Sequence, residues 1–457
     1  MRRGPIVRLV GLCCAVLLTA FATYAAAQSD PVGGRVGVHE GVASCSGSTC
    51  HSRPVASGLV VRQNELIAWQ DSQSEAGAHS RAWRVLTEPR GQGIARRLGL
   101  GPAQSAPACL GCHADPAPAA QRGARFQLAD GVGCEACHGA AGGWIASHYA
   151  VGATHAANVS KGLIPLDDPK ARANNCLDCH FGSARPGQFI THEIMAAGHP
   201  QVTFELDLFT SLQRHHDIDA DYIARQKVSV GGVKTWAVGQ TAALERALTL
   251  YADPAHAGGA FPEFYFFDCQ SCHRPISDDP RWRPAAQANP ARPIPAGQPP
   301  FNDANMIMLS AAARATAPGL SARFEADSRA FHAALARDRP GALRAAAQLA
   351  ATSRALGSAF AGRSFGRADT FAIFDAVLSS ESVGRYTDYA GASQAVMAAD
   401  TLLNAMVAQG QLDRAAAARI RPDLDRAYQA VKDPNAFRPE QLRQALQQAA
   451  QSARALR

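Results

Sequence analysis

From about residue 301 onward the chain is rich in Ala, Leu, Arg and Gln, contains no cysteine, and carries apolar residues at helical spacing. Apolar positions three and four residues apart predict amphipathic helices, and prolines stand where two of these helices can begin. The pattern is typical of an antiparallel helical bundle, and the high alanine content implies close packing of its helices. The expected helices cover residues 340–360, 392–407, 414–431 and 439–456, with an interruption at 433–435.

The first half of the chain has a shorter and more broken helical pattern. Residues 78–98 follow it apart from a break that we expect near Pro89, and residues 238–251 follow it throughout. Alternation of apolar and polar residues is scarce, and no repeat of fixed period is found apart from the motifs described below. The sequence therefore predicts a mostly α-helical fold with little regular strand.

The first 27 residues have the pattern of a secretory signal peptide. A basic start is followed by an apolar run over residues 9–22 and by three alanines at 25–27. We expect cleavage near Ala27, which places the mature protein in the periplasm. The alternative is an uncleaved membrane anchor, but the run is shorter than the roughly 20 residues that a span needs. No other segment of the sequence has a transmembrane pattern.

The cysteines carry the most specific signal in the sequence. Of twelve cysteines, two lie in the predicted signal peptide, and the other ten form five pairs, each followed at once by a histidine. Four are C-x-x-C-H motifs, the attachment sequence of c-type haem, and the first has four residues between its cysteines. The motifs are Cys45-x4-Cys50-His51, Cys109-x2-Cys112-His113, Cys134-x2-Cys137-His138, Cys176-x2-Cys179-His180 and Cys269-x2-Cys272-His273.

The spacing within these motifs suits haem chemistry. Two thiols must reach the two vinyl groups at one porphyrin edge to form thioethers, while the adjacent histidine places an imidazole nitrogen on the iron. A redox dithiol, a zinc site or plain disulfides are alternatives for one motif, but five copies with no cysteine left over disfavour them.

The first motif needs separate weighing because its loop is longer. It can be a small disulfide loop followed by a chance histidine, or it can bridge the vinyl groups if its Ser, Gly and Thr residues bulge outward. The sequence predicts five haems c, four at the short motifs and a fifth at Cys45, Cys50 and His51.

Ten further histidines are candidates for the second axial position of these irons. Neutral imidazole is the usual second ligand of an electron-transfer haem, and filling both positions closes the iron to substrates. His192 and His199 are seven residues apart and would share one helix face if their segment is helical. The strongest metal-ligand candidates by context are His79, His148, His192 and His199, followed by His155. Ranked lower are His39, His215 and His216, and then His256 and His332, which we interpret as surface histidines.

Charge and composition change this picture little. The net charge is +7, but the cationic residues are nearly all arginine and are scattered, so no nucleic-acid-binding stripe is present. Aromatic residues make up only 7% of the chain, and haem macrocycles would supply apolar core that side chains otherwise provide. Haem propionates would bring the protein close to neutral charge, so its basicity predicts no acidic partner.

Prolines crowd residues 275–300 and predict a stiff linker or a strap around the preceding domain. This segment separates the cysteine motifs from the Ala-rich helices. The predicted domains are a signal peptide over 1–27, a pentahaem cytochrome c domain over 28–278, a Pro-rich linker over 279–300 and an Ala-rich helical domain over 301–457.

Three elements together resemble a known family. They are Gly131-Val-Gly-Cys134-Glu-Ala-Cys137-His138-Gly with His148 downstream, the segment from Trp69 to His79 ahead of a C-x-x-C-H motif, and Ala-Gly-His199-Pro. They are similar to the exported multihaem cytochromes related to hydroxylamine oxidoreductase and to the nitrifier tetrahaem cytochrome that takes electrons from it.

The resemblance covers roughly residues 40–275 and implies a mostly α-helical fold organised by stacked haems. It also implies that His79, His148 and His199 are axial ligands. The first motif departs from the family pattern, and the Ala-rich helices lie outside the resemblance, so it carries over neither partner nor pathway.

Two functions remain open at this stage. The first is a periplasmic electron carrier that passes electrons between redox partner proteins through mostly bis-histidine haems, with docking to a membrane quinol-oxidising or respiratory complex as one setting. The second is a multihaem oxidoreductase in which one open haem acts on hydroxylamine, nitrite or a sulfur oxyanion. The electron carrier is favoured over the multihaem oxidoreductase, but whether the protein is an enzyme is left open. Neither function involves nucleic acid or a membrane span after signal cleavage.

Overall fold

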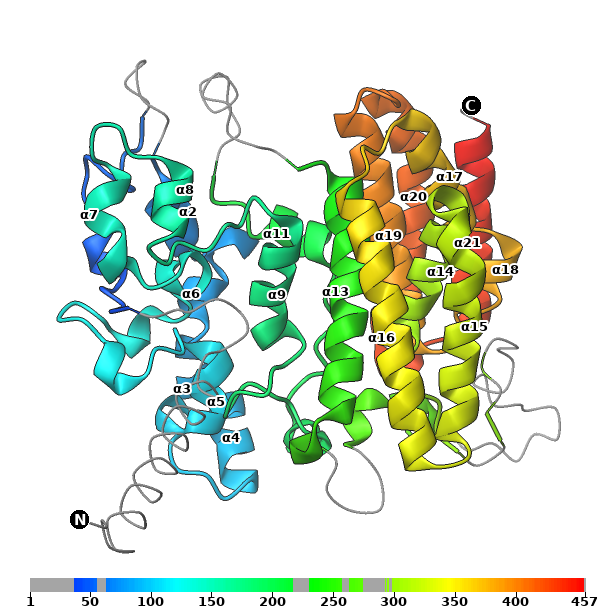
Figure 1. Ribbon diagram of the computed structural model, residues 1–457, viewed down its shortest axis with the longest axis horizontal. Helices are drawn as coiled ribbons and strands as arrows, with labels where there is room; N and C mark the ends of the chain where they lie inside the picture. Colours follow the sequence, from blue (N-terminus) through cyan, green and yellow to red (C-terminus); the bar gives the residue numbers. More distant parts are fainter. Residues whose placement is uncertain are drawn as a thin grey trace, which may run out of the picture. The chain divides into compact units, whose positions relative to one another are not determined.

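The computed structural model describes residues 37–55, 63–216, 230–256, 263–273, 292, 294–295 and 298–455. The predicted signal peptide and most of the predicted Pro-rich linker lie outside these ranges. Within them the secondary structure is α-helix and short 3₁₀ helix, with isolated β-bridges at His39–Arg122 and Phe267–Phe301 and no regular strand. The prediction of a mostly α-helical fold is therefore confirmed (Figure 1).

The chain divides into two compact units. The smaller unit contains the described residues of 37–44, 117–126 and 134–164, and with them the third cysteine motif. The larger unit contains 45–116, 127–133 and the chain from 165 onward, and with them the other four motifs and the Ala-rich helices.

The smaller unit is built from short helices held by one buried carboxylate. Glu135 accepts hydrogen bonds from the backbone N–H groups of Glu40, Gly41 and Ala141 at 2.8, 2.7 and 2.6 Å. These bonds join the segment 37–44 to the third motif and to the chain that follows it. The elements are η1 (Val42–Ser44), η5 (Ala119–Gln121), α6 (Cys134–His138), η7 (Ala141–Gly143), α7 (Ile145–His148) and α8 (His155–Val159).

In the larger unit, the part that carries the cysteine motifs is also made of short helices. The predicted break at Pro89 is confirmed: α3 ends at Thr87, Glu88 is extended, and Pro89 is the first residue of α4. Proline favours this position because its missing N–H would have no helical partner there. The elements are α2 (Glu65–Gln70), η2 (Glu75–Gly77), η3 (His79–Arg81), α3 (Arg84–Thr87), α4 (Pro89–Arg97), η4 (Ala103–Ser105), α5 (Pro107–His113), η6 (Leu128–Asp130), α9 (Pro169–His180), α10 (His192–Ala196) and α11 (Leu206–Leu212).

The longer helices of the larger unit form a bundle, and the four predicted helices of the Ala-rich region are confirmed as α16, α19, α20 and α21. The predicted helix at 238–251 is also confirmed, within α13. No helix among the described residues is both long and apolar enough to cross a bilayer. The elements are α13 (Gly232–Ala252), η8 (Pro254–His256), η9 (Phe264–Phe266), η10 (Cys269–Ser271), α14 (Ala304–Thr316), α15 (Pro318–Leu335), α16 (Arg339–Ala361), α17 (Arg367–Val377), α18 (Ser380–Val383), α19 (Tyr389–Ala408), α20 (Arg414–Ala430), η12 (Pro434–Ala436) and α21 (Pro439–Arg454).

Small residues allow the helices of the bundle to pack closely, as the alanine content implied. On α16, a Cβ added at Gly357 would lie 2.9 Å from Thr241 Oγ1 of α13, and Ser353 Oγ donates to the Thr241 carbonyl at 3.2 Å. Trp236 of α13 is fully buried in the same hydrophobic cluster as Phe331 and Phe374. The core of the bundle thus begins within α13, upstream of the boundary that we predict at residue 278.

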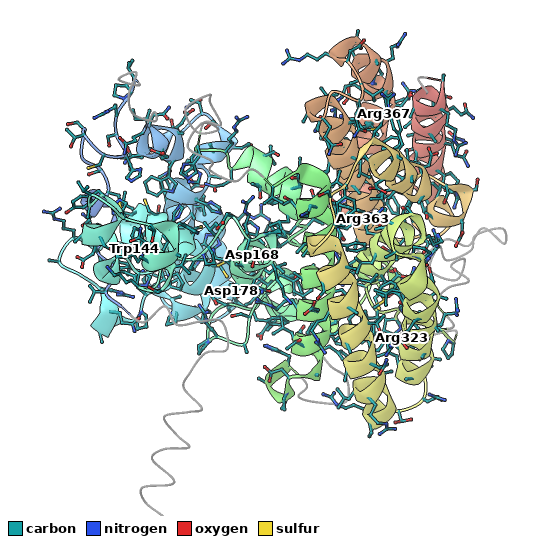
Figure 2. All side chains as sticks on the ribbon, turned by 45° about the horizontal axis from the view of Figure 1, so that its top comes forward. Trp144, Asp168, Asp178, Arg323, Arg363 and Arg367 are labelled. Atoms are coloured by element: carbon teal, nitrogen blue, oxygen red, sulfur yellow. The ribbon has the colours of Figure 1, made fainter. Side chains whose placement is uncertain are left out.

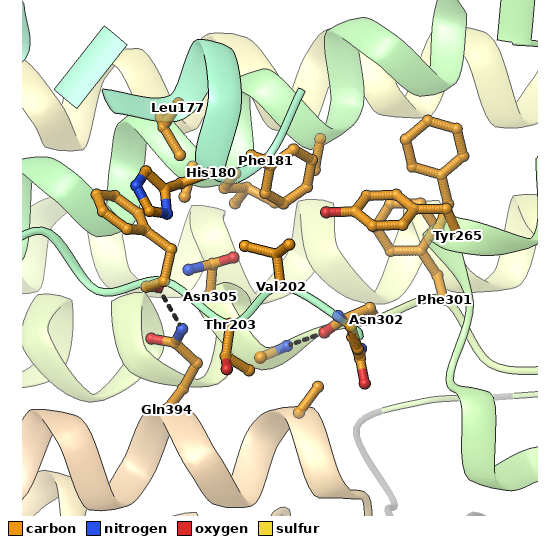
Figure 3. Close-up of a pocket in the computed structure, with 18 residues that line it drawn as sticks. Leu177, His180, Phe181, Val202, Thr203, Tyr265, Phe301, Asn302, Asn305 and Gln394 are labelled. Carbon is orange, nitrogen blue, oxygen red and sulfur yellow. Dashed lines mark hydrogen bonds between the residues drawn. The ribbon is translucent and has the colours of Figure 1, made fainter. Parts of the chain in front are cut away.

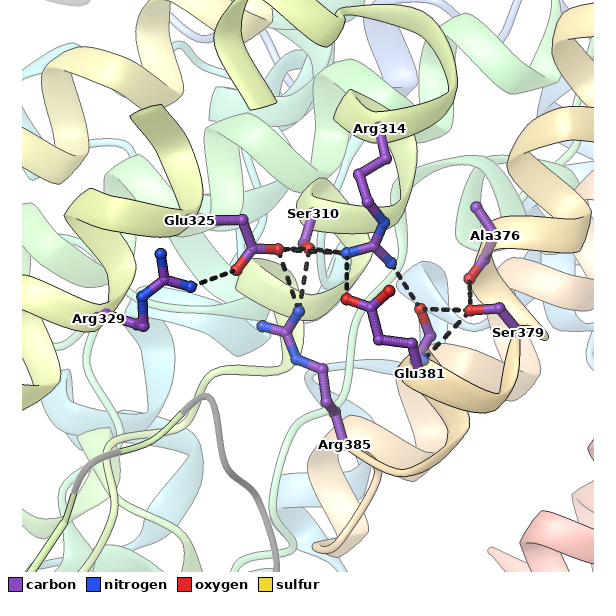
Figure 4. A network of polar contacts seen from close by, with 9 residues as sticks. Ser310, Arg314, Glu325, Arg329, Ala376, Ser379, Glu381 and Arg385 are labelled. Carbon is purple, nitrogen blue, oxygen red and sulfur yellow. Dashed lines mark hydrogen bonds and ion pairs between the residues drawn. The ribbon is translucent and has the colours of Figure 1, made fainter. Parts of the chain in front are cut away.

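The bundle also contains a network of charged side chains between helices (Figure 4). Glu325 of α15 lies 3.3 Å from Arg314 of α14 and 3.2 Å from Arg385, and Arg314 also contacts Glu381 of α18 at 3.0 Å. These contacts fix α18 against α14 and α15. Because Arg314 and Glu381 are partly exposed, we expect their ion pair to contribute less than about 1 kcal/mol to stability.

Candidate functional site

The four short cysteine motifs lie at or beside helix ends. Three of them occupy the last turn of a helix, namely α5, α6 and α9, and the fifth motif begins with η10. Residues three apart on a helix lie on one face, so this local structure puts both cysteines of a pair on the same side, and the histidine follows at the helix end. The ten described cysteines form no disulfide.

The first motif forms a turn instead of a helix. The N–H groups of Cys50 and Ser52 donate to the Gly47 carbonyl at 2.8 and 3.3 Å, and residues 47–50 are exposed. This is the outward bulge that the Ser, Gly and Thr residues were expected to permit.

Three motif histidines of the larger unit each face a histidine predicted as an axial ligand. The ring centroids are 6.0 Å apart for His79 and His180, 6.3 Å for His113 and His199, and 6.0 Å for His192 and His273. Two imidazoles on opposite sides of one metal ion, bound at about 2.0 Å, have centroids roughly 6.2 Å apart. Each pair therefore has the spacing of two axial ligands of one iron.

The environment keeps several of these imidazoles neutral, the form that binds metals. Burial lowers the pKa of His180 to about 4, and burial also lowers the pKa values of His79, His113 and His199. His113 Nδ1 lies 2.8 Å from the Ala82 carbonyl, and His199 Nδ1 lies 2.8 Å from the Pro200 carbonyl. A carbonyl only accepts, so Nδ1 carries the proton in both rings and Nε2 offers its lone pair to a metal.

His192 and His199 do not share a helix face. Helix α10 ends at Ala196, and Gly198 follows with φ of 106°, a conformation that a residue with a Cβ rarely adopts. This turn takes His199 away from His192, and the two pair with different motifs. The condition for a shared face, one continuous helix through both residues, is not met because α10 is only five residues long.

The remaining candidate histidines have varied surroundings. In the smaller unit, His138 is the last residue of α6 and His148 is the last residue of α7. His148 Nδ1 lies 2.5 Å from the Ile145 carbonyl oxygen, and the ring centroids of His148 and Trp144 are 5.4 Å apart. His155 is exposed at the start of α8. The axial roles of these three stay predictions.

His332 differs from its predicted surface location. It is buried in α15, its Nδ1 lies 2.9 Å from the Ser328 carbonyl, and burial lowers its pKa to about 4. The amphipathic pattern of α15 turns this position toward the bundle core. The His256 ring stacks on that of Phe189, with the ring centroids 4.0 Å apart.

Helix α13 of the bundle supports the fourth motif. Asp178, labelled in Figure 2, lies between Cys176 and Cys179 and accepts a hydrogen bond from Arg246 Nη1 at 2.8 Å. The same nitrogen donates to the Gly182 carbonyl at 2.8 Å. At the other end of α9, Asp168 caps the helix by accepting the N–H of Lys170. The helix that carries the fourth motif is thus fixed at both ends.

A second support covers the His180 ring. Phe204 stacks on it with centroids 5.0 Å apart, and Gln394 of α19 donates to the Phe204 carbonyl at 2.7 Å (Figure 3). The next residue, Glu205, is buried and accepts a hydrogen bond from Thr401 Oγ1, also of α19, at 2.9 Å. Burial raises the pKa of Glu205 to about 8. Sequence reasoning missed this role of α19, since nothing in an Ala-rich helix indicates which loop it contacts.

The second and fourth motifs lie against each other. Cys112 Sγ is 3.8 Å from the Gly187 carbonyl, and Cys179 Sγ is 3.7 Å from the Gly111 carbonyl. A Cβ at Gly111 would lie 2.2 Å from the Gly187 oxygen, so only glycine fits between the two cysteines of the second motif at this position. The two attachment loops are therefore in direct contact.

Sequence reasoning also missed a carboxylate beside the first motif. Glu65 Oε2 lies 3.1 Å from His51 Nδ1, and Glu65 Oε1 lies 3.3 Å from His216 Nδ1. Burial raises the pKa of Glu65, but the hydrogen bonds with His216 and His51 outweigh it and hold the pKa well below its usual range. No motif in the sequence connects this glutamate to His51.

Comparison with protein families found one match, over part of the chain. Residues 45–139 match the family described as cytochrome c554 and c-prime. The matched segment begins at the first cysteine of the first motif and ends one residue after His138, so it spans three of the five motifs. No curated protein and no solved structure matches the chain. The family match supports a c-type cytochrome with haem c as its cofactor.

Proposed function

We propose that this c-type cytochrome binds five haems c and carries electrons between redox partner proteins in the periplasm. The observation that carries the proposal is the set of three histidine pairs at axial spacing, His79–His180, His113–His199 and His192–His273. In each pair one histidine belongs to a cysteine motif and the other comes from a distant part of the sequence. Filling both axial positions with imidazole favours electron transfer over substrate binding.

The donor set fits haem c at each motif. Each pair of thiols would form the thioethers and each motif histidine would be the first axial ligand, with His148 and His155 as further candidates for the second position. When bound, each haem supplies an iron that is reduced and reoxidised by one electron. The chain's part is to bind the group, fix the orientation of the imidazoles and exclude water from them.

The contact between the second and fourth motifs supports a carrier. Electron transfer needs neighbouring redox groups, and these loops bring two attachment sites together through Cys112, Cys179 and the glycines beside them. The family match supports the same class of function for residues 45–139. Relationship to the hydroxylamine oxidoreductase superfamily, export, and docking to a membrane quinol-oxidising or respiratory complex belong to this proposal.

The bundle serves as the rigid support of the fourth and fifth sites in this account. Arg246 and Gln394 connect it to the fourth motif, and the bridge between Phe267 and Phe301 connects it to the segment just before the fifth. The bundle thereby fixes the orientation of His180 without providing a ligand.

The haem count tests the proposal. The wild-type chain is expected to carry five covalent haems, and a Cys45→Ser/Cys50→Ser variant is expected to carry four, because the thioethers at the first motif can no longer form. Intact mass and the pyridine haemochrome absorbance per chain measure the count. Thr49→Ala, within the same exposed loop, is the matched control and should keep five. Four haems in the wild type, with Cys45 and Cys50 in a disulfide, would contradict the proposal.

A further inference from the structure

The first motif is fastened to the start of α2 by its backbone. The Leu66 N–H donates to the His51 carbonyl at 3.0 Å, and the Arg53 N–H donates to the Gln63 carbonyl at 2.6 Å. Further along α2, Trp69 is buried and its Nε1 donates to the Val132 carbonyl at 3.1 Å. These bonds fix the beginning of α2, and with it Glu65, relative to His51.

Glu65 is placed to accept a hydrogen bond from His51. Its side chain is 15% exposed, and its two oxygens face two imidazoles, His51 at 3.1 Å and His216 at 3.3 Å. A carboxylate only accepts, so His51 Nδ1 donates its proton toward Glu65. His51 Nε2 then carries the lone pair, as a motif histidine requires.

The second motif provides a contrast within the same unit. There His113 Nδ1 donates to the neutral Ala82 carbonyl at 2.8 Å, whereas His51 donates to a charged group. A carboxylate pulls the shared proton more strongly than a carbonyl does, which makes the imidazole a more basic ligand. A more basic ligand stabilises ferric over ferrous iron.

We propose that Glu65 is a positioning residue that acts through His51 and lowers the reduction potential at the first motif below the value that a carbonyl partner would give. This inference rests on the proposed function, because it requires a haem at Cys45 and Cys50. It assigns the atypical motif a distinct electronic role, that of a site that gives up its electron readily. The side chain of Glu65 would set this property without contacting the iron.

The test is a spectroelectrochemical titration of the full-length holoprotein. Glu65→Gln keeps the size and an accepting oxygen but removes the charge. We expect it to raise the ferrous-to-ferric ratio of one haem in five about tenfold at a fixed potential, a shift of 59 mV for a one-electron couple. The shifted component should be the one missing from the titration of Cys45→Ser/Cys50→Ser. Glu65→Asp, which keeps the carboxylate, should shift the reduction potential of this haem less than Glu65→Gln does.

The control is Glu88→Gln, which removes the same charge from an exposed side chain in the same unit and should leave the titration unchanged. A Glu65→Gln protein with five haems and a wild-type titration would overturn the inference alone. Loss of one haem in Glu65→Gln would also overturn it, since Glu65 would then be needed for assembly of the site. A wild-type count of four haems would overturn the five-haem proposal and this inference with it.

Discussion

A His79→Gly protein, reduced with dithionite, is expected to bind carbon monoxide at about one haem in five, whereas the wild type binds none. His79 is half-buried and faces His180 at 6.0 Å between ring centroids. Its removal would leave one axial position of the fourth site without an imidazole while His180 stays in place. Carbon monoxide binds ferrous haem wherever an axial position is open.

The support of His180 makes this prediction specific to one site. Phe204 still stacks on its ring, and Gln394 and Arg246 still fix the loop and helix around it. His79→Met retains an axial donor, because thioether sulfur is also an iron ligand, and should bind markedly less carbon monoxide than the glycine variant. The measurement is the carbon monoxide difference spectrum, scaled to total haem. An unchanged spectrum for the glycine variant, with five haems bound, would show that His79 is not an axial ligand.

An Arg292→Met protein is expected to lose about 3–5 kcal/mol of unfolding free energy, the usual effect of removing one partner of a buried ion pair. The Arg292 side chain is fully buried and contacts Asp303 at 3.4 Å and Asp388 at 3.0 Å. It also donates to Thr387 Oγ1 at 2.7 Å. Burial and the nearby Asp303 raise the pKa of Asp388, and the Arg292 guanidinium opposes this effect. Without the guanidinium, the two carboxylates would be left together in an apolar core.

Arg323→Met is the matched control for this effect. Arg323 is 61% exposed and its Nε lies 3.8 Å from Asp327 on the same helix, so we expect a loss of less than about 1 kcal/mol. Urea unfolding of both holoproteins, followed by far-ultraviolet circular dichroism, gives the two free energies. Similar losses of unfolding free energy in the two variants would show that the ion pairs of Arg292 with Asp303 and Asp388 do not stabilise the bundle.

The helices of the bundle could be predicted because their signals are local. Apolar spacing and the prolines at 340 and 439 are enough to locate α16 and α21 to within a few residues. The cysteine motifs could be predicted for the same reason, since each consists of a few consecutive residues. His332 was misplaced because one polar residue on an apolar helix face does not reveal that its Nδ1 finds a carbonyl one turn earlier.

The pairing of histidines could not be predicted, because it depends on tertiary contacts. Context identified His192 and His199 as candidates, but a helix of five residues and the turn at Gly198 direct them to different motifs. Glu65 gave no signal at all, since a carboxylate at the start of a helix has many ordinary roles. The support of Phe204 by α19 was equally hidden, because it joins segments that are far apart in the sequence.

The carbon monoxide difference spectrum of the dithionite-reduced wild-type protein tests the account most directly. If mostly bis-histidine haems carry electrons between partners, the spectrum shows no change on addition of carbon monoxide. A change equivalent to about one haem in five would contradict the carrier account. It would favour the multihaem oxidoreductase, with hydroxylamine, nitrite and sulfur oxyanions as the substrates to test.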